Sequence, residues 1–319
     1  MVVFFLIVLG SLSFVSGTSA EPIDVFANSL SLDTGTQLDG PNGTLIYRGG
    51  FELTSPDARF GGLSGLVISS DGAELVAVSD RGWWLQARLG YDLNGDLVSI
   101  NVGELTPMLS VDAQYNEGSV RLDAEALVRL PNGDFVVAFE RPHRLWQYSG
   151  TNAVARSLRV ASILKGLPHN RGIEALAMLD GERLIAIAES GPSASAMSGW
   201  VFGVTQSESF SYPYDGYFRP SDAVRMDDRR VLVLERGYTE RRGVAGRLML
   251  LDVVTITAGA RLQPRQFVEL GPPIPLDNFE ALAVRHGPCG ALLVYLLSDD
   301  NYSPRQRTLL LMFEFVEME

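Results

Sequence analysis

Cysteine, histidine and lysine are all scarce in this chain of 319 residues. The single cysteine, Cys289, excludes an internal disulfide framework and any zinc site built on several cysteines. The three histidines, His143, His169 and His286, show none of the close spacings that are typical of zinc sites. Lys165 is the only lysine, so an anion site here would be built from arginine, whose planar guanidinium binds phosphate or carboxylate bidentately.

Positive charge is also in short supply. There are 38 acidic and 26 basic residues, which gives a formal net charge of -12 at neutral pH. Such a charge repels phosphate backbones and anionic membranes, so nucleic acid is not an expected partner. The chain contains no P-loop, no G-x-G-x-x-G fingerprint and no G-x-S-x-G elbow, so nucleotide binding, NAD chemistry and an α/β-hydrolase serine mechanism are unsupported. We expect a monomer that binds a small anionic ester.

A long continuous apolar run lies near the N-terminus. Residues 2–9 are continuously apolar, and the small residues 17–20 precede Glu21. This order is typical of a secretory signal peptide, and the run is too short to span a bilayer well. We therefore predict a signal peptide at 1–20, a single domain at 21–319, no stable transmembrane anchor, and export to a bacterial periplasm or the extracellular space. The missing lysine or arginine before the apolar run leaves an upstream start or an uncleaved anchor open.

One short phrase occurs five times along the chain. It consists of an acidic or small polar residue, an apolar run, a turn, a second apolar run and a closing acidic residue. Turns such as Asn132-Gly133 are strong hairpin signals, because type I′ turns need positive φ at both central residues. The phrases begin about 50 to 60 residues apart, a period typical of four-stranded propeller blades. The five opening residues are Ser64, Glu125, Glu174, Asp222 and Glu280.

Each hairpin is followed by a further β-rich run, such as 144–148, which supplies a third strand. The last repeat runs out of chain at Glu319, whereas the run 45–53 precedes the first repeat without a partner. We therefore predict an all-β fold, a five-bladed β-propeller whose N-terminal strand completes the last blade and closes the ring. A sixth, degenerate blade is left open. The runner-up, a double sheet or sandwich, does not explain repetition at this period.

The acidic residues of the repeats are expected to meet at one face. The first acid opens one strand of each hairpin and the second closes the other, so both lie at the end opposite the turn. Close like charges raise one another's pKa, so neighbouring cations must offset so many carboxylates. A hard divalent cation, for which we expect Ca²⁺, takes six to eight oxygen ligands. The predicted rim consists of Asp80, Glu125, Glu140, Glu174, Glu189, Asp222, Glu235, Glu280 and Asp299.

Arginine and histidine side chains fall beside this rim. The arginines are candidates for binding an anionic substrate: Arg81, Arg141, Arg171 and Arg236. His143 and His169 are candidates for acid–base catalysis, whereas His286 belongs to the turn of the last hairpin on the opposite face. For any one carboxylate the alternative is a structural ion pair that holds blades together.

The ordered phrases of the chain resemble the phytase-like family, often described by an esterase-like activity of phytase. They are RFGGLSGL (59–66), AVSDRG (77–82), DAEAL (123–127), GIEALA (172–177), LVLERG (232–237), DNFEALAV (277–284) and LSDDNYSPRQRTLLL (297–311). The resemblance extends from about Phe51 to Phe315 and implies an exported propeller with phosphodiesterase- or phosphatase-type activity. The family's acidic positions correspond to Asp80, Glu125, Glu140, Glu174, Glu235, Glu280, Asp299 and Asp300.

The leading hypothesis is cation-assisted hydrolysis of phosphate mono- or diesters. Glu174 or Glu125 would act as general base, and the arginines would bind the ester. The expected metal ligands are Asp80, Glu140, Glu189, Asp222, Glu235, Glu280, Asp299 and Asp300. Two alternatives stay open: a carboxyl-ester or lactone hydrolase, and a non-catalytic propeller that binds a ligand or protein and keeps its metal for structure.

Overall fold

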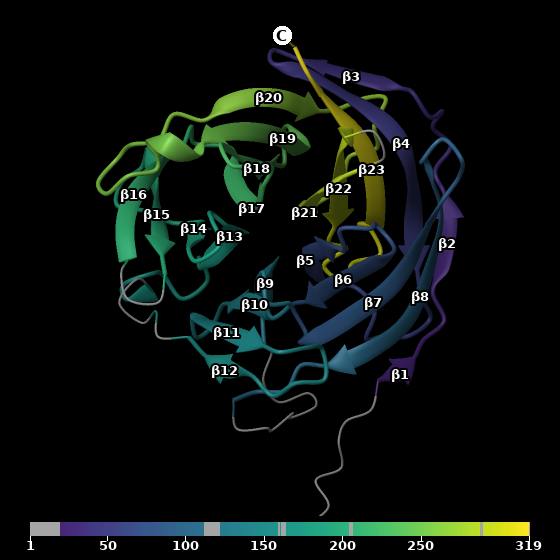
Figure 1. Ribbon diagram of the computed structural model, residues 1–319, viewed down its shortest axis with the longest axis horizontal. Helices are drawn as coiled ribbons and strands as arrows, with labels where there is room; N and C mark the ends of the chain where they lie inside the picture. Colours follow the sequence, from purple (N-terminus) through teal and green to yellow (C-terminus); the bar gives the residue numbers. More distant parts are fainter. Residues whose placement is uncertain are drawn as a thin grey trace, which may run out of the picture.

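The computed structural model describes residues 20–111, 122–158, 160, 164–203, 207–287 and 290–318. Its strands form five sheets arranged radially around a central axis, as the blades of a propeller (Figure 1). The predicted signal peptide and Cys289 lie outside the described residues. Within these residues no helix is long and apolar enough to cross a membrane.

Blades 1 to 4 follow one another along the chain. Blade 1 contains β5 (Leu63–Ile68), β6 (Glu74–Ser79), β7 (Trp83–Tyr91), β8 (Leu97–Pro107) and, outermost, β1 (Glu21–Pro22). Blade 2 contains β9 (Ala124–Arg129), β10 (Phe135–Phe139), β11 (Arg144–Tyr148) and β12 (Arg156–Ser157). Blade 3 contains β13 (Ile173–Met178), β14 (Leu184–Ala188), β15 (Ala196–Phe202) and β16 (Ser207–Pro213). Blade 4 contains β17 (Arg219–Arg225), β18 (Arg230–Thr239), β19 (Gly243–Asp252) and β20 (Arg265–Leu270), and the 3₁₀ turn η1 (Val253–Thr255) follows β19.

Blade 5 joins the two ends of the chain. It contains β21 (Phe279–His286), β22 (Leu292–Ser298), β23 (Thr308–Glu317), β4 (Gly43–Thr54) and β2 (Phe26–Ser29), and β3 (Gln37–Gly40) also pairs with β4. β4 is antiparallel to β23, with Phe51 opposite Leu310, and Figure 1 shows the purple and yellow strands side by side. The predicted five-bladed fold and its closure by the run 45–53 are therefore confirmed, and the described strands form no sixth blade.

Turn chemistry and burial explain the hairpins. Gly133 has a φ of 93°, and the Asn132 side chain accepts a hydrogen bond from the main-chain N–H of Asp134, so this turn satisfies itself locally. All five residues of β10 are buried, because neighbouring blades cover both faces of the sheet. Trp84 is fully buried between blades 1 and 2, and its ring centroid lies 5.2 Å from that of Tyr148. Burial of one such side chain contributes about 1.5–3 kcal/mol.

Every blade carries a β-bulge near the start of its innermost strand. The register between the first and second strands shifts across one unpaired residue: Ser64, Glu125, Glu174, Ser221 or Glu280. The alignment of the fourth repeat was therefore wrong by one residue, since Asp222 pairs with Leu234 and the unpaired residue is Ser221. The acidic side chain of Asp222 suggested that this residue was equivalent to the opening residues of the other repeats. The pairing of β17 with β18 shows that Ser221 is the equivalent residue.

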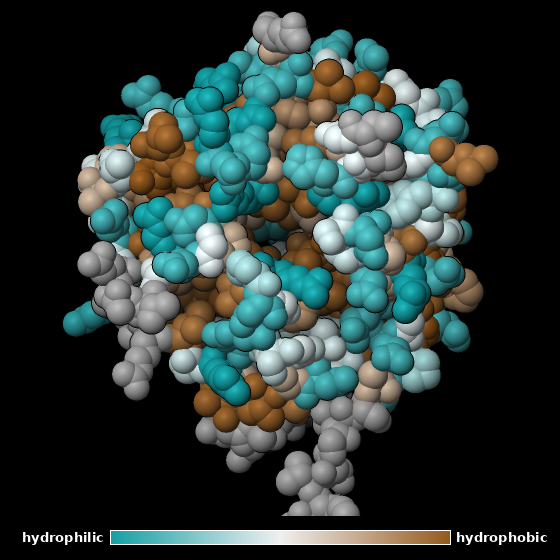
Figure 2. All heavy atoms as spheres, viewed as in Figure 1, coloured by the Kyte–Doolittle hydropathy of each residue, from teal (hydrophilic) through white to brown (hydrophobic). Residues whose placement is uncertain are grey.

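The five innermost strands β5, β9, β13, β17 and β21 contact their neighbours around a central channel. All five run in the same direction, so their first residues gather at one mouth and their later residues surround the far half. That far half encloses a cavity of about 190 Å³ with largely apolar walls, which include Leu66, Leu127 and Val284. In Figure 2 the face in view is hollowed near its centre, with hydrophobic residues in and around the opening.

Candidate metal centre and acidic mouth

Three of the five bulge residues are glutamates, and they converge at one mouth of the channel. Glu125 of β9, Glu174 of β13 and Glu280 of β21 come from three different blades and are each half-buried. A bulge leaves its residue out of the strand ladder and re-aims its side chain. The glutamates interact electrostatically, because the charges of Glu174 and Glu280 both raise the pKa of Glu125.

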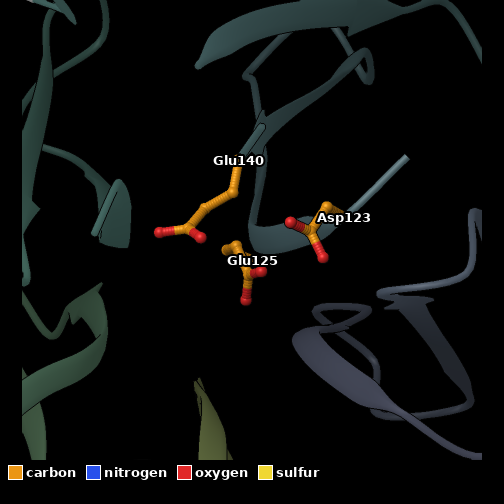
Figure 3. A group of neighbouring side chains, drawn as sticks. All are labelled: Asp123, Glu125 and Glu140. Atoms are coloured by element: carbon orange, nitrogen blue, oxygen red, sulfur yellow. The ribbon is translucent and has the colours of Figure 1, made fainter. Parts of the chain in front are cut away.

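A group of three carboxylates lies beside this convergence. Each of Asp123, Glu125 and Glu140 offers one oxygen, and these oxygens all lie within 4.8 Å of one another (Figure 3). Asp123 immediately precedes β9 and has a φ of 58°, while Glu140 follows β10. The main-chain N–H of Glu140 donates to the carbonyl of Asp123 at 2.9 Å, which fixes the two acids relative to each other.

Main-chain and arginine donors hold the outer two acids of this group. Arg141 binds Asp123 bidentately, with Nη2 2.9 Å from Oδ1 and Nε bonded to Oδ2. The main-chain N–H of Gly172, in the next blade, donates to Oε1 of Glu140. A Cβ at position 172 would come within 2.8 Å of Nδ1 of His143 and 3.0 Å of Cγ of Glu140, so only glycine fits here. Asp123 and Glu140 are therefore pre-positioned by residues of two blades.

The electrostatics of the mouth favour a bound cation. Burial raises the pKa of Glu125 well above its ordinary value, and the charges of Glu174 and Glu280 raise it further. Burial likewise raises the pKa of Glu174, with Glu189 and Glu140 the next causes. The pKa of Glu140 is also raised, mainly by burial, although the N–H of Gly172 opposes the shift. A divalent cation among these oxygens would offset the repulsion.

The donor set fits a hard metal ion. Asp123, Glu125 and Glu140 supply only carboxylate oxygens, which are the ligands that hard divalent cations prefer. Two of the three side chains are buried, and the third is half-buried where it faces the mouth. This cluster could therefore bind a metal ion.

A second acidic group surrounds the Gly62 turn of blade 1. The N–H of Gly62 donates to Oδ1 of Asp300 at 3.0 Å, and a Cβ at position 62 would come within 2.3 Å of Oδ1 of Asp80. Asp299, which directly precedes Asp300 in the sequence, is buried. Its Oδ1 accepts a hydrogen bond from the main-chain N–H of Asn301 at 2.7 Å. Burial, followed by the charge of Glu280, raises the pKa of Asp299 to about 9.

Arg236 is the predicted arginine that the structure brings into the mouth itself. Its Nη2 lies 3.0 Å from Oε1 of Glu280. Burial alone would lower its pKa, but surrounding carboxylates, led by Glu280 and Glu174, raise it above its ordinary value. Arg141 binds Asp123 as described, and Arg81 stacks on the ring of Tyr302 at 3.2 Å from the centroid.

The two predicted histidines differ in their surroundings. His143 lies beside Gly172, and its Nε2 is 2.7 Å from the carbonyl oxygen of Pro168. Its side chain interacts electrostatically with Glu140. His169 and Arg171 are exposed on the loop that precedes β13. Of these three residues, His143 is the one that lies near the metal-binding group, since it and Glu140 both approach Gly172.

Three predicted metal ligands already have other partners. Asp222 is buried, and its carboxylate accepts main-chain N–H groups of Ala223 at 2.8 Å and Leu282 at 2.7 Å. These bonds satisfy main-chain N–H groups of β17 and β21, which are innermost strands next to the channel. Burial raises its pKa well above the ordinary value. Its carboxylate therefore links blades 4 and 5.

Glu235 and Glu189 pair with arginines. Glu235 is buried, accepts the hydroxyl of Tyr212 at 2.6 Å and forms an ion pair with Arg247. Glu189 lies 3.6 Å from Nε of Arg219. Neither carboxylate belongs to the group of Asp123, Glu125 and Glu140.

Asp123 is the site residue that sequence reasoning missed. It stands two residues before the bulge glutamate of blade 2, where the other blades have Gly62, Gly172, Arg219 and Asn278. Alignment of the repeats on their bulges would have singled out this acid. The left-handed backbone at Asp123 and its pairing with Arg141 give no sequence signal.

Solved structures match this chain only at low sequence identity and low TM-score. U3-55K is 11% identical with a TM-score of 0.40, covering 91% of this chain and 99% of that one. The RRP9 WD40 repeats are 12% identical with a TM-score of 0.40, covering 92% of this chain and 100% of that one. The β-propeller domain of Swd1 from Myceliophteria thermophila is 11% identical with a TM-score of 0.38, covering 89% and 99%. Likeness at this level carries no information on function.

The sequence comparison is more specific. No curated protein matches the chain. The family model Phytase-like, described as "Esterase-like activity of phytase", matches residues 58–302, which contain the acidic mouth and all five bulges. At this coarse level the match and the propeller fold support a phytase-like hydrolase. The chain belongs to the phytase-like family.

Proposed function

We propose that this protein hydrolyses phosphate esters at the acidic mouth of its channel with the help of a bound Ca²⁺. The observation that carries the proposal is the convergence of Asp123, Glu125 and Glu140, next to further glutamates whose pKa values are raised. Family membership supports the hydrolase class. Oxygen-only ligands and a mouth crowded with carboxylates favour calcium over softer metals.

Asp123, Glu125 and Glu140 would hold the cation. When bound, a divalent cation polarises a phosphoryl oxygen and lowers the pKa of water in its coordination sphere. Arg141 keeps Asp123 oriented, and the N–H of Gly172 keeps Glu140 oriented. Outer partners of this kind set the geometry of metal ligands.

Glu174 is the proposed acid–base residue. It is not among the three ligands, yet it is coupled electrostatically to Glu140 and Glu280. A carboxyl group whose pKa is raised holds and releases a proton closer to neutral pH. Its carboxylate would take a proton from the attacking water and return it to the leaving oxygen. Arg236, which pairs with Glu280 through Nη2 and interacts electrostatically with Glu174, would bind the anionic ester.

Export is part of the same proposal. An apolar run at 2–9 followed by small residues supports a signal peptide at 1–20 and a periplasmic or extracellular location. Extracellular calcium sites bind with Kd values of about 10⁻⁴ to 10⁻³ M, which suits a site of three carboxylates that is open at the mouth. We propose that the exported protein is a monomer.

One observation favours a second candidate, carboxyl-ester or lactone hydrolysis. The far half of the channel has largely apolar walls and encloses about 190 Å³, room for part of an acyl chain. The family description also names an esterase-like activity. The two candidates predict different substrate preferences at the same metal centre.

A substrate panel tests the proposal. The protein is assayed on phosphate monoesters, phosphate diesters, carboxyl esters and lactones, with added calcium and with chelator. We expect turnover of phosphate esters that chelation abolishes.

Glu125→Gln should abolish this turnover as well. The matched control is Glu182→Gln, which changes an exposed acid in the turn before β14 and should leave turnover unchanged. Turnover of carboxyl esters alone would favour the second candidate. Absence of turnover, with thermal stability that depends on calcium, would indicate a non-catalytic propeller.

A further inference from the structure

A cavity of about 250 Å³ opens beside the acidic mouth, where the end of blade 3 meets blade 4. It shares Glu174 and Arg236 with the mouth. Glu189 and Arg219 also line it. The remaining lining residues are three tyrosines together with Gly216, Pro220 and Thr239. A group attached to a phosphoryl centre at the mouth would therefore have this cavity next to it.

The charges that line the cavity are balanced. Arg236 pairs with Glu280 at 3.0 Å, and Nη1 of Arg219 donates to the carbonyl of Glu189 at 2.6 Å. Nε of Arg219 lies 3.6 Å from the carboxylate of Glu189. Each arginine therefore already has an acidic partner. A second phosphate group entering the cavity would meet two carboxylates, Glu174 and Glu189, and would have to displace one of these pairs.

The polar groups select for a hydroxylated ligand. A hydrocarbon group would displace water from these ionised side chains without replacing the hydrogen bonds that the water makes, which costs free energy. Hydroxyl groups donate to carboxylates and accept from guanidinium groups, so they satisfy both kinds of lining residue. Three tyrosine rings add apolar surface to the same walls: Tyr214, Tyr217 and Tyr238. An arginine lies over Tyr214 and over Tyr217, with its guanidinium 4.7 Å and 4.9 Å from the respective ring centroid. This combination matches a sugar ring, which has hydroxyl edges and C–H faces.

The wall that carries these tyrosines is rigidly held. The main-chain N–H groups of Tyr217 and Phe218 both donate to Oδ1 of Asp215 at 2.9 Å. Asp215 binds Arg247 at 3.0 Å, and Arg247 in turn binds Glu235. Glu235, which was predicted as a metal ligand, thus helps to position this wall through Arg247 and Asp215. Pre-organisation of this kind lowers the entropic cost of binding.

Gly237 fixes the ring of Tyr217 in the same wall. A Cβ at position 237 would come within 2.5 Å of that ring, so the ring packs directly on the backbone of β18. The hydroxyl of Tyr217 also donates to the carbonyl of Gly243 at 3.3 Å. Tyr238, the next residue along β18, stands at the lip of the cavity with 60% of its surface exposed.

We propose that this cavity binds the alcohol part of the ester as an uncharged sugar ring, so that the substrates are sugar monophosphates. The inference rests on the function proposed above and narrows it. In the reaction the water oxygen forms a bond to phosphorus, and the bond from phosphorus to the sugar oxygen breaks. The sugar oxygen takes up the proton that Glu174 received from the water, and inorganic phosphate and the free sugar leave.

Three phosphate esters of primary alcohols test the sugar preference on the full chain with calcium. They are hexose 6-phosphate, propyl phosphate, which lacks the ring hydroxyls, and hexose 1,6-bisphosphate, which carries a second phosphate. We expect kcat/KM for hexose 6-phosphate to exceed that of each of the others by about tenfold or more, the ratio that corresponds to 1.4 kcal/mol. Similar kcat/KM values for all three, or a preference for the bisphosphate, would overturn the inference while the phosphatase function stands.

A variant at the lip localises the preference. Tyr238→Ala should lower the ratio of kcat/KM for hexose 6-phosphate over propyl phosphate by about tenfold. Phe26→Ala is the matched control, because Phe26 is also an aromatic residue exposed to 60% but lies on β2 of blade 5. An unchanged ratio in Tyr238→Ala would exclude the cavity as the sugar site.

A binding measurement separates this inference from the proposed function. Methyl hexoside has no phosphate, so its binding to the full chain, followed by ligand-observed NMR, does not depend on catalysis. Binding that Tyr238→Ala weakens, together with no turnover of any phosphate ester, would keep the sugar site and reject the phosphatase function. Turnover of phosphate esters without binding of the hexoside would reject the sugar site alone.

Discussion

Blades 1 and 4 carry a serine at the same β-bulge where blades 2, 3 and 5 carry a glutamate. Both serines are buried and serve the packing of blades. Ser64 donates to the carbonyl of Ala124 in blade 2, and Ser221 donates to the carbonyl of Phe279 in blade 5 at 3.2 Å. In each case the hydroxyl joins its blade to the next one around the ring.

The glutamates at the other three bulges, when ionised, cannot donate such a hydrogen bond to a neighbouring blade. An ionised carboxylate has no proton to donate to a main-chain carbonyl, so it needs N–H donors, arginine or a cation. Glu280 uses Arg236, whereas Glu125 and Glu174 are left with raised pKa values. The propeller thus supplies five equivalent positions, and side-chain chemistry decides which of them hold blades together and which form a site.

Glu125→Gln should have the largest effect. This substitution removes the central member of the three-carboxylate group, so we expect calcium to lose its stabilising effect and turnover to fall by about 10²-fold or more. Thermal unfolding with and without calcium, together with kcat on a phosphate ester, measures both. If calcium still raised the Tm of the variant as much as that of the wild type, the metal centre would lie elsewhere.

Glu174→Gln should separate catalysis from metal binding. Because Glu174 is the proposed acid–base residue and not a ligand, we expect turnover to fall by about 10²- to 10⁴-fold. Calcium affinity, measured by calorimetric titration, should stay within about threefold of the wild type, since the three ligands remain. Equal loss of calcium affinity in Glu174→Gln and Glu125→Gln would show that the two bulge glutamates share one role.

The pH dependence of the metal-free protein should report the acids that gather at this mouth. Burial, followed by the charge of Glu280, raises the pKa of Asp299 to about 9. A folded-state pKa above the unfolded one means that the stabilisation is complete at low pH and is lost as pH rises through the folded value. We therefore expect the Tm in chelator to fall from about pH 5 to about pH 9. Asp299→Asn should flatten that slope.

Calcium provides the control for this pH effect. Metal binding requires ionised ligands, so added calcium should raise the Tm more at alkaline than at acidic pH. A Tm in chelator that rises with pH over this range, or an Asp299→Asn variant with the wild-type slope, would contradict the assignment.

Substitution of the two bulge serines, in blades 1 and 4, should have the smallest effect on the protein. Ser64→Ala and Ser221→Ala each remove a hydrogen bond between blades, so the free energy of unfolding should fall by about 1 kcal/mol per substitution. Turnover and calcium affinity should be unchanged, because both hydroxyls donate to main-chain carbonyls and neither serine is one of the three proposed ligands. Denaturant unfolding and a standard assay test this. A loss of turnover in Ser64→Ala at unchanged stability would break the contrast between the two kinds of blade.

The architecture was predictable because its signals are local. Asn-Gly and Asp-Gly turns between apolar runs specify hairpins through backbone conformations that only a few residues adopt. Their period indicated blades, and the unpartnered run 45–53 indicated the strand that closes the ring beside β23. The sequence also predicted that acidic residues gather at one mouth, since strand direction alternates regularly across a hairpin.

The composition of the site was less predictable. Glu125 and Glu140 were expected at the mouth, but Asp123 was not, because its position depends on a φ of 58° and on Arg141. Asp222 was expected as the opening residue of the fourth repeat, but Ser221 occupies the equivalent position at the bulge of blade 4. Both differences come from register and backbone conformation, which a one-residue shift changes without altering the hydrophobic pattern.

An acidic five-bladed propeller of the phytase-like family could be predicted from the amino-acid sequence, because repeats, turns and charge are properties of short segments. The use of each carboxylate, in contrast, depends on the folded arrangement of the blades. It brought Asp123, Glu125 and Glu140 within 4.8 Å of one another, and it joined Glu235 to Tyr212 and Arg247 on other strands. The physical reason is that the role of a carboxylate depends on which donors and charges surround it, and blades far apart in sequence supply them.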